Sequence, residues 1–196
     1  TVLFLDIRMP DISMPENIIA VSSRARCLLD ESQVENGLDR MAVKISESLS
    51  ELNPILMCIM NGGLIVSGKL ATRLNFPLEI DYLHATRYRD KTTGADLEWK
   101  SYPNLDLTNR VVLLVDDILD EGATLEKIIN YCNSQGASSV YSAVLLDKKH
   151  TRKVPGLLAD FVGFEIDDFY LYGYGMDYKG HLRNANGVFA IDESDR

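Results

Sequence analysis

Short runs of mostly apolar residues mark the strands that we expect inside a sheet. The runs are residues 55–60, 111–115, 140–146 and 161–166. A strand that is covered on both faces carries apolar side chains on both, so such runs are typical of parallel strands in α/β proteins. A further segment, in which Leu78, Ile80 and Tyr82 alternate with polar residues, predicts a half-exposed strand.

Apolar residues repeat at helical spacing in the first third of the chain. Asp30 and Gln33 form a capping-box pattern, and the helix that they predict is stopped by Asn53-Pro54. Its apolar positions are Leu38, Met41, Ala42, Ile45, Leu49 and Leu52. Residues 64–74 and 125–132 predict two more helices, the second ending near Gly136.

Residues 85–104 have no clear period and are rich in Thr, Arg, Lys, Asp and Gly. They predict a long loop or flexible hairpin, and long loops in compact domains are often functional lids. Elsewhere strands and helices alternate, which predicts an α/β fold with a doubly wound, mainly parallel sheet. We expect residues 1–196 to form a single domain. The N-terminal segment and about 160–190 would form a small hood over the carboxyl edge of the sheet.

Composition limits the class of protein. The chain has 196 residues, of which 46% are hydrophobic and 25% charged, as in an ordinary globular domain. A net charge of −9 argues against a general nucleic-acid surface, so a site for polyanions must concentrate positive charge locally.

Location and redox state are also constrained by the sequence. Apolar runs such as Ile55 to Met60 are too short to span a bilayer, and Asp6 and Arg8 interrupt the apolar start of the chain, so we expect neither membrane insertion nor secretion. The predicted location is therefore the cytoplasm. Cys27, Cys58 and Cys132 are widely spaced and predict reduced, buried thiols rather than a disulfide or zinc site.

The most informative segment is residues 111–125. Its apolar strand ends in Asp116 and Asp117, and ligands of open α/β sheets bind at that edge. Asp120 follows, and Glu121-Gly122-Ala123-Thr124 then offers consecutive backbone N–H groups at a helix N-terminus. This is a cradle for phosphate. Because carboxylates repel phosphate, the acid pair should bind hydroxyls or a metal ion, which points to a phosphorylated sugar with Mg²⁺.

A second interpretation of this segment is the first acidic strand of a response-regulator receiver domain. In that class the acid pair lies near the N-terminus of the domain, and a phosphoacceptor Asp ends a later strand. Here 110 residues precede the motif, and Leu145-Leu146-Asp147 offers a later strand ending in Asp. Asp120 and the Gly-x-Thr pattern favour the sugar-phosphate site, with the receiver domain kept as an alternative.

With its strand, two acids, two apolar residues, Asp and Gly-x-Thr, the segment closely resembles the phosphoribosyl pyrophosphate (PRPP) signature of type I phosphoribosyltransferases. The resemblance implies the fold of that family. It also implies that Asp116 and Asp117 bind the ribose hydroxyls. The 5′-phosphate would be bound by Asp120, Glu121, Gly122, Ala123 and Thr124. Glu121 stands where the family usually has Thr or Ser, so its carboxylate must point away from the phosphate.

Segments outside the motif resemble hypoxanthine-guanine phosphoribosyltransferases in particular. Asn61-Gly62-Gly63 resembles their pyrophosphate-binding loop, with Asn61 where Lys is common, so that only backbone binding is implied there. Arg87-Tyr88 lies where the family has a Ser-Tyr pair on a mobile lid, and Tyr88 matches that pattern. Lys148 matches the Lys that binds the purine 6-oxo group.

The C-terminal third resembles the purine-binding hood of the same enzymes. The matching blocks are Asp160 to Ile166 and Gly173 to Tyr178 with Arg183. They imply that Tyr170 stacks on the purine, that Leu171 offers backbone groups to the base, and that Arg183 binds pyrophosphate. Asp177 is implied both near the base and as a ligand of Mg²⁺, together with Asp116 and Asp117. Without the resemblance, these tyrosines predict an ordinary half-buried aromatic cluster.

The function implied is transfer of the phosphoribosyl group from PRPP to N9 of a 6-oxopurine, hypoxanthine and/or guanine, in purine salvage. The products would be IMP or GMP and pyrophosphate. Asp120 would act as general base or hydrogen-bond acceptor at purine N7. The expected partners are PRPP, the purine base and further copies of the chain in a homodimer or homotetramer. Two alternatives stay open, a phosphoribosyltransferase for another base and a PRPP-sensing regulator of the same fold.

Overall fold

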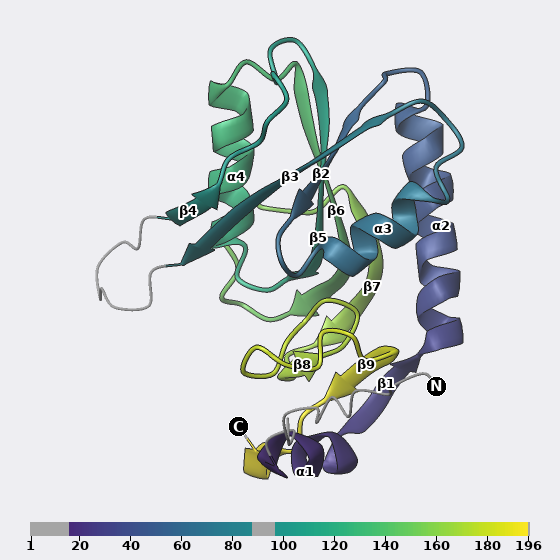
Figure 1. Cartoon of the computed structure of the whole chain (residues 1–196), viewed down its shortest axis with the longest axis vertical. Helices are drawn as coiled ribbons and strands as arrows, with labels where there is room; N and C mark the ends of the chain where they lie inside the picture. Colours follow the sequence, from purple (N-terminus) through teal and green to yellow (C-terminus); the bar gives the residue numbers. More distant parts are fainter. Residues whose placement is uncertain (1–15, 88–96, 196) are drawn as a thin grey trace, which may run out of the picture.

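A six-stranded sheet forms the centre of the protein in a computed structural model that describes residues 16–87 and 97–195 (Figure 1). Its strands lie in the order β4-β3-β2-β5-β6-β7. They are β2 (Ile55–Ile59), β3 (Glu79–Arg87), β4 (Leu97–Ser101), β5 (Val111–Leu119), β6 (Ser139–Lys149) and β7 (Phe161–Asp167). All neighbouring pairs are parallel except β3 and β4. The predicted doubly wound, mainly parallel sheet is confirmed.

Helices cover both faces of this sheet. The helices α2 (Glu31–Leu49) and α3 (Leu64–Ala71) pack on one face, and α4 (Ala123–Ser134) packs on the other (Figure 1). The predicted capping box is present at the start of α2. The Asp30 carboxylate accepts from the Gln33 backbone N–H at 2.8 Å, and the Gln33 side chain accepts from the Asp30 N–H at 2.9 Å. These bonds satisfy two backbone donors that a helix start or its flanking residue leaves open.

The continuous apolar run of β5 is explained by its two covered faces. Leu113 and Val115 belong to the core under α2 and α3, whereas Val112 and Leu114 belong to the core under α4. Successive side chains of a strand point to opposite faces, so both sets must be apolar when both faces are covered. All four side chains are fully buried.

A second, three-stranded sheet joins the two ends of the described chain. Its order is β1-β9-β8, and it consists of β1 (Arg26–Asp30), β9 (Gly187–Ala190) and β8 (Leu171–Tyr172). Figure 1 shows this sheet at one end of the molecule, next to α1 (Glu16–Arg24) and the short 3₁₀ helix Glu193–Asp195. Pairing of β1 with β9 thus brings residues more than 150 positions apart into contact.

Several element boundaries differ from those predicted. The helix α2 ends at Leu49 and α3 at Ala71, each three residues before the predicted end. Two forms were predicted for residues 85–104, a long loop or a flexible hairpin. The structure has a hairpin, because β3 continues to Arg87 and pairs with β4 in antiparallel register. The sequence shows no alternation of apolar and polar residues here, because β4 is the edge strand of the sheet and edge strands carry many polar side chains.

The predicted burial of the three cysteines is confirmed for two of them. Cys58 and Cys132 are buried free thiols, as predicted, but Cys27 is exposed, so the expectation of burial is wrong for that residue. Cys27 lies on β1, at the margin of the small sheet. Among the helices of residues 16–87 and 97–195, none is long and apolar enough to cross a membrane.

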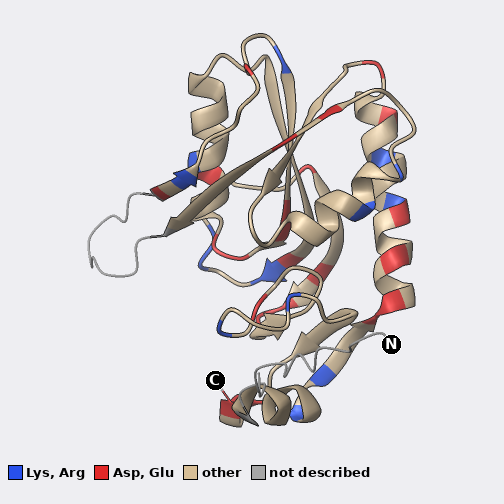
Figure 2. Cartoon of the chain, viewed as in Figure 1, with Lys and Arg blue, Asp and Glu red and all other residues tan. Residues whose placement is uncertain are grey.

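An ion-pair network centred on Glu35 ties α2 and α3 to the C-terminal segment. The Glu35 carboxylate accepts from Lys69 Nζ at 2.6 Å and from the hydroxyl of Tyr174 at 2.7 Å, and it also binds Arg73. Figure 2 shows acidic and basic residues close together where the two helices meet. Burial acts to raise the pKa of Glu35, but the hydrogen bonds from Lys69, Tyr174 and Arg73 outweigh it and lower the pKa to about 2.

Glu35→Gln is expected to lower the free energy of unfolding at pH 7 by about 1–3 kcal/mol. A lowered pKa in the folded state stabilises the protein above the unfolded pKa, here near 4.5, and this contribution is lost as the pH falls towards about 2. The difference between wild type and variant should therefore shrink over that interval. Urea unfolding at a series of pH values measures it. Glu47→Gln, at an exposed position of the same helix, is the matched control. An equal and pH-independent loss in both variants would contradict the assignment.

Candidate active site

A cavity of about 510 Å³ lies at the carboxyl edge of the main sheet. It opens where β2 and β5 end, and the connections of these neighbouring strands leave in opposite directions along the sheet. Ligands of open α/β sheets bind at such switch points. Leu171, in β8 of the small sheet, and the preceding Tyr170 close the other side.

The loop after β2 fits tightly against the end of β5 because it contains two consecutive glycines, Gly62 and Gly63. A Cβ on Gly62 would lie 2.5 Å from Asp117 Oδ2, and a Cβ on Gly63 would lie 2.3 Å from the carbonyl oxygen of Val115. Any larger residue would therefore collide with the strand that carries the acid pair. With Asn61, this loop forms one wall of the cavity.

Asp116 and Asp117 end the apolar part of β5 and face a largely desolvated environment. Burial raises the pKa of Asp116 well above its usual range, and the charge of Asp117 raises it further. Burial also raises the pKa of Asp117, against the lowering effects of its hydrogen bonds and of Arg183. A cation or hydroxyl donors that enter the cavity would stabilise the ionised forms of these two neighbouring acids.

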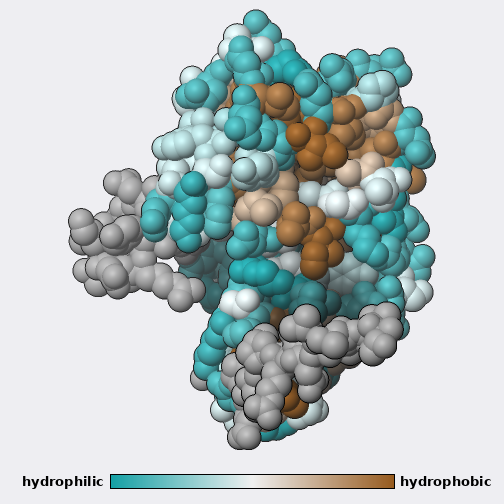
Figure 3. Space-filling model, viewed as in Figure 1, coloured by the Kyte–Doolittle hydropathy of each residue, from teal (hydrophilic) through white to brown (hydrophobic). Residues whose placement is uncertain are grey.

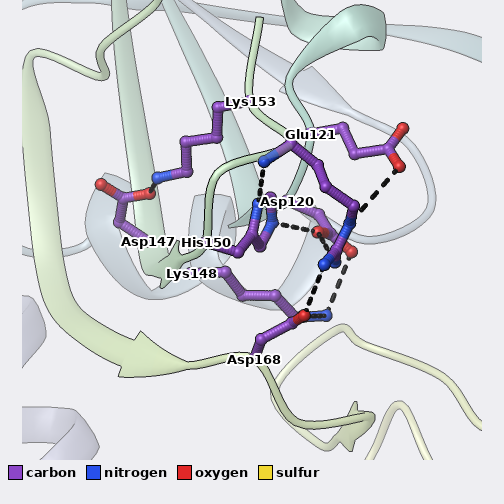
Figure 4. A network of polar contacts seen from close by, with 8 residues as sticks. Asp120, Glu121, Asp147, Lys148, His150, Lys153 and Asp168 are labelled. Carbon is purple, nitrogen blue, oxygen red and sulfur yellow. Dashed lines mark hydrogen bonds and ion pairs between the residues drawn. The ribbon is translucent and has the colours of Figure 1, made fainter.

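Asp120 directly follows β5 and is held by two donors, one at the end of β6 and one just after it. Lys148 Nζ donates to Asp120 Oδ2 at 3.0 Å, and His150 Nε2 contacts Oδ1 at 2.7 Å. Figure 4 shows these side chains and that of Asp168 converging. Burial alone would raise the pKa of Asp120, but the hydrogen bonds from Lys148 and His150 outweigh it and lower the pKa. The lowered pKa favours the ionised carboxylate of Asp120.

The side chains of Asp120, His150 and Asp168 bring potential metal ligands within 4.8 Å of one another. Cationic side chains already occupy this group. Lys148 Nζ lies 3.5 Å from Asp168 Oδ1, and Arg152 Nη1 lies 2.8 Å from Asp168 Oδ2. A divalent ion would meet two positive charges there, so the chemistry of the group is that of an ion-pair cluster rather than a metal site.

The loop from Glu121 to Thr124 leads into the N-terminus of α4. Gly122 adopts φ +87, a left-handed conformation that favours glycine, and a Cβ there would lie 2.4 Å from Leu157. Free N–H groups at the start of a helix attract anions. The Glu121 carboxylate lies 4.0 Å from the guanidinium of Arg152, which reduces the effect of its negative charge on this anion site.

Arg183 and Asp177 form the opposite wall of the cavity. Arg183 Nη2 binds Asp177 Oδ1 at 2.5 Å, and its Nη1 donates to the carbonyl oxygen of Gly175. Gly175 in turn donates its N–H to the Arg183 carbonyl at 3.0 Å. Gly175 has φ +111, and a Cβ there would lie only 2.0 Å from the carbonyl oxygen of Gly62. The Arg183 segment and the Gly62 loop therefore meet at this glycine.

Residues 26–179 match the model of the phosphoribosyl transferase domain. The chain belongs to this family. Curated relatives of the chain are also phosphoribosyltransferases. The chain is 30% identical over 172 residues to the hypoxanthine-guanine phosphoribosyltransferase of Aquifex aeolicus, with 87% of this chain and 96% of that protein covered. It is 26% identical over 169 residues to the hypoxanthine-guanine-xanthine phosphoribosyltransferase of Tritrichomonas foetus, with 86% and 92% covered.

Solved structures of phosphoribosyltransferases share the fold. A hypoxanthine phosphoribosyltransferase from Staphylococcus aureus superimposes with a TM-score of 0.81 at 24% identity, over 86% of this chain and 92% of that one. The resemblance inferred from the sequence is thereby confirmed. A receiver domain, the other interpretation of the acid pair, is excluded, and Asp147 instead forms an ion pair with Lys153.

The phosphoribosyl transferase structure brings most of the predicted site residues to one cavity. Those that line it are Asn61, Gly62, Asp116, Asp117, Asp120, Glu121, Gly122, Thr124, Lys148, Tyr170, Leu171, Asp177 and Arg183. Ala123 does not line it. The side chain of Arg87 and the whole of Tyr88, the predicted lid pair, lie outside the described residues. The roles of all these residues stay predictions.

Further polar residues at or near the cavity were not predicted from the sequence. His84 and Lys100 line it from β3 and β4, and His150 and Asp168 contact Asp120 or Lys148 beside it. Burial lowers the pKa of His84, as do the nearby charges of Lys100 and Arg183. His150 is two residues beyond Lys148, and that proximity was the one available signal.

Proposed function

We propose that this phosphoribosyl transferase joins a 6-oxopurine, hypoxanthine and/or guanine, to PRPP in purine salvage, giving IMP or GMP and pyrophosphate. One observation carries the proposal. A single cavity contains an acid pair for sugar hydroxyls, a helix N-terminus for phosphate, and Lys148 beside Tyr170 for an oxygen-bearing aromatic base. The names of the curated relatives support the same reaction.

PRPP would lie along the end of β5. Asp116 and Asp117 would accept hydrogen bonds from the ribose hydroxyls, and the loop from Glu121 to Thr124 would hold the 5′-phosphate. The pyrophosphate would lie between the backbone of Asn61-Gly62 and Arg183. Since Asn61 brings no charge, Arg183 and the nearby Lys100 would neutralise most of the pyrophosphate.

The purine would enter between Lys148 and Tyr170. Tyr170 is 42% exposed, lines the cavity and meets Tyr178 edge-on with 5.9 Å between the ring centroids, so its ring would be accessible for stacking on the base. Lys148 would donate to the 6-oxo oxygen, and Leu171 and Asp177 would lie at the edge of the base. Asp120 would take the proton of purine N7, which makes N9 more nucleophilic as C1′ becomes cationic.

The acid pair and Asp177 would fit a magnesium ion, because carboxylate oxygens are its preferred protein ligands and all three side chains line the same cavity. Burial raises the pKa of Asp116 and of Asp117, and a bound cation would favour their ionised forms. When bound, Mg²⁺ would neutralise the oxygens of PRPP and its leaving pyrophosphate. To bind the ion, Asp177 would have to give up its ion pair with Arg183. Arg183 would then be free to bind pyrophosphate.

We propose a single domain over residues 1–196, with the N-terminal segment and about 160–190 acting as a hood. Figure 3 shows hydrophobic surface in the region of β3 and α3, where Leu64 and Ile80 are 53% and 61% exposed. Such a face supports a homodimer or homotetramer. The free thiols support the cytoplasm as the location.

Pyrophosphate release from PRPP and Mg²⁺, assayed with a panel of bases, tests the proposed function. Hypoxanthine or guanine should give the highest kcat/KM, and adenine, uracil and orotate should be at least about 100-fold poorer substrates. A clear preference for one of these other bases would favour a phosphoribosyltransferase of different specificity. PRPP binding without turnover on any base would favour the PRPP-sensing regulator.

Lys148→Ala is expected to lower kcat/KM for hypoxanthine and guanine by about 10- to 100-fold, with a smaller effect on any residual use of adenine. The side chain is 9% exposed, so its loss leaves the 6-oxo oxygen without a donor in a desolvated site. Lys149→Ala is the matched control, because that neighbouring side chain is 58% exposed and pairs with Glu165. An unchanged preference for 6-oxopurines over adenine would refute the role of Lys148.

A further inference from the structure

We propose that His150 is a positioning residue for the transfer reaction. Its imidazole would hold one oxygen of Asp120 so that the other faces purine N7. This inference rests on the proposed function, in which Asp120 accepts the N7 proton. Neither the motif nor the predicted purine site includes His150, which lies in the turn after β6.

Hydrogen bonds at both ring nitrogens define the state of the imidazole. The backbone N–H of Arg152 donates to His150 Nδ1 at 3.1 Å, so Nδ1 must be unprotonated. Nε2 lies 2.7 Å from Asp120 Oδ1, an acceptor, so Nε2 must carry the proton. The side chain is 5% exposed, so water competes little for either bond. The contacts therefore favour a neutral imidazole with its proton on Nε2.

The second oxygen of Asp120 has a different partner. Oδ2 accepts from Lys148 Nζ at 3.0 Å, and the same ammonium lies 3.5 Å from Asp168. A 6-oxopurine offers Lys148 a new acceptor and offers Oδ2 a proton at N7. Lys148 would turn to the base, whereas His150 has no such alternative. The bond from His150 to Oδ1 would then be the short hydrogen bond that continues to orient the carboxylate, since Arg152 Nη2 lies 4.0 Å from the same oxygen, beyond hydrogen-bond distance (Figure 4).

The proton balance of the step leaves His150 unchanged. The N7 proton moves to Asp120 Oδ2, and the N9 lone pair forms the bond to C1′. The bond from C1′ to the pyrophosphate oxygen breaks, and its electron pair leaves with pyrophosphate. A neutral donor suits this task, because it fixes the rotation of the carboxylate without adding the full positive charge that would weaken Asp120 as a base.

Kinetics of His150→Ala and His150→Gln test the inference. Loss of the donor in His150→Ala should lower kcat with hypoxanthine by about 10- to 50-fold, while KM for PRPP changes less than about twofold. The amide of Gln can place an N–H near the position of Nε2, so His150→Gln should stay within about threefold of wild type. His181→Ala, an exposed histidine that does not line the cavity, is the control and should match wild type.

Imidazole ¹⁵N NMR of the wild-type protein adds a readout that does not depend on turnover. It should show His150 protonated at Nε2 alone, with a resonance that moves in Asp120→Asn. Wild-type kcat in His150→Ala, no rescue by Gln, or a proton on Nδ1 would overturn the role of His150. If wild type transferred no 6-oxopurine, the proposed function would fail, and the NMR result would still decide whether His150 holds Asp120.

Discussion

Replacing Asp120 by Asn is expected to lower kcat by about 10²- to 10³-fold, with less than about a threefold change in KM for PRPP. The substitution keeps the shape of the side chain but removes its ability to take a proton. Burial would raise the pKa of the wild-type carboxylate, but the donors Lys148 and His150 outweigh it and lower the pKa, which favours the ionised form. The proposed proton acceptor would therefore be lost with little change at the ribose and phosphate sites.

Steady-state kinetics with hypoxanthine, together with direct PRPP titration, measure this effect. Asp147→Asn is the matched control, because Asp147 also lies near the carboxyl end of a strand but pairs with Lys153 and does not line the cavity. It should retain kcat within about twofold. Equal losses of kcat and of PRPP affinity in Asp120→Asn would assign Asp120 to PRPP binding instead of base activation.

The second large effect is expected from Gly175→Ala, in which a single methyl group should disrupt the cavity. Its Cβ would lie 2.0 Å from the carbonyl oxygen of Gly62, on a backbone with φ +111. Either the pyrophosphate loop or the segment that carries Arg183 must move. We expect a loss of about 2–4 kcal/mol in the free energy of unfolding and at least a tenfold rise in KM for PRPP.

Gly156→Ala separates backbone strain from the collision. Gly156 also has a positive φ, +80, but a Cβ there would meet nothing within 4 Å. This control should lose only about 1–2 kcal/mol and leave KM for PRPP unchanged. Thermal or urea unfolding and initial-rate kinetics give both quantities. Similar KM values in the two variants would contradict the close contact between Gly175 and the Gly62 loop.

The main sheet and its helices were predictable because their signals are local. Four apolar runs correspond to β2, β5, β6 and β7, and the Asp30-Gln33 capping box marked the start of α2. The small sheet was not predictable in the same way. β1 and β8 have five and two residues, and their partner β9 pairs with β1 across almost the whole chain. Such pairing depends on tertiary packing and leaves no periodic pattern.

In the candidate site too, residues with a local sequence signal were predictable and the others were not. Residues that directly follow parallel strands, such as Asp116, Gly62 and Lys148, were predictable because the ends of neighbouring strands meet at one edge. His150 and Asp168 were not, because their side chains reach Asp120 and Lys148 from loops whose direction the sequence does not define. Gly175 was predicted only as part of a resembling block, and its contact with Gly62 required the structure.

Product stoichiometry in a single reaction tests the central claim most directly. Wild-type protein would be incubated with PRPP, Mg²⁺ and radiolabelled hypoxanthine, and IMP and pyrophosphate would be quantified together. The account predicts equimolar IMP and pyrophosphate over many turnovers, with both reduced at least about 100-fold in Asp120→Asn. Pyrophosphate release without IMP, or the absence of both products with hypoxanthine and with guanine, would contradict it.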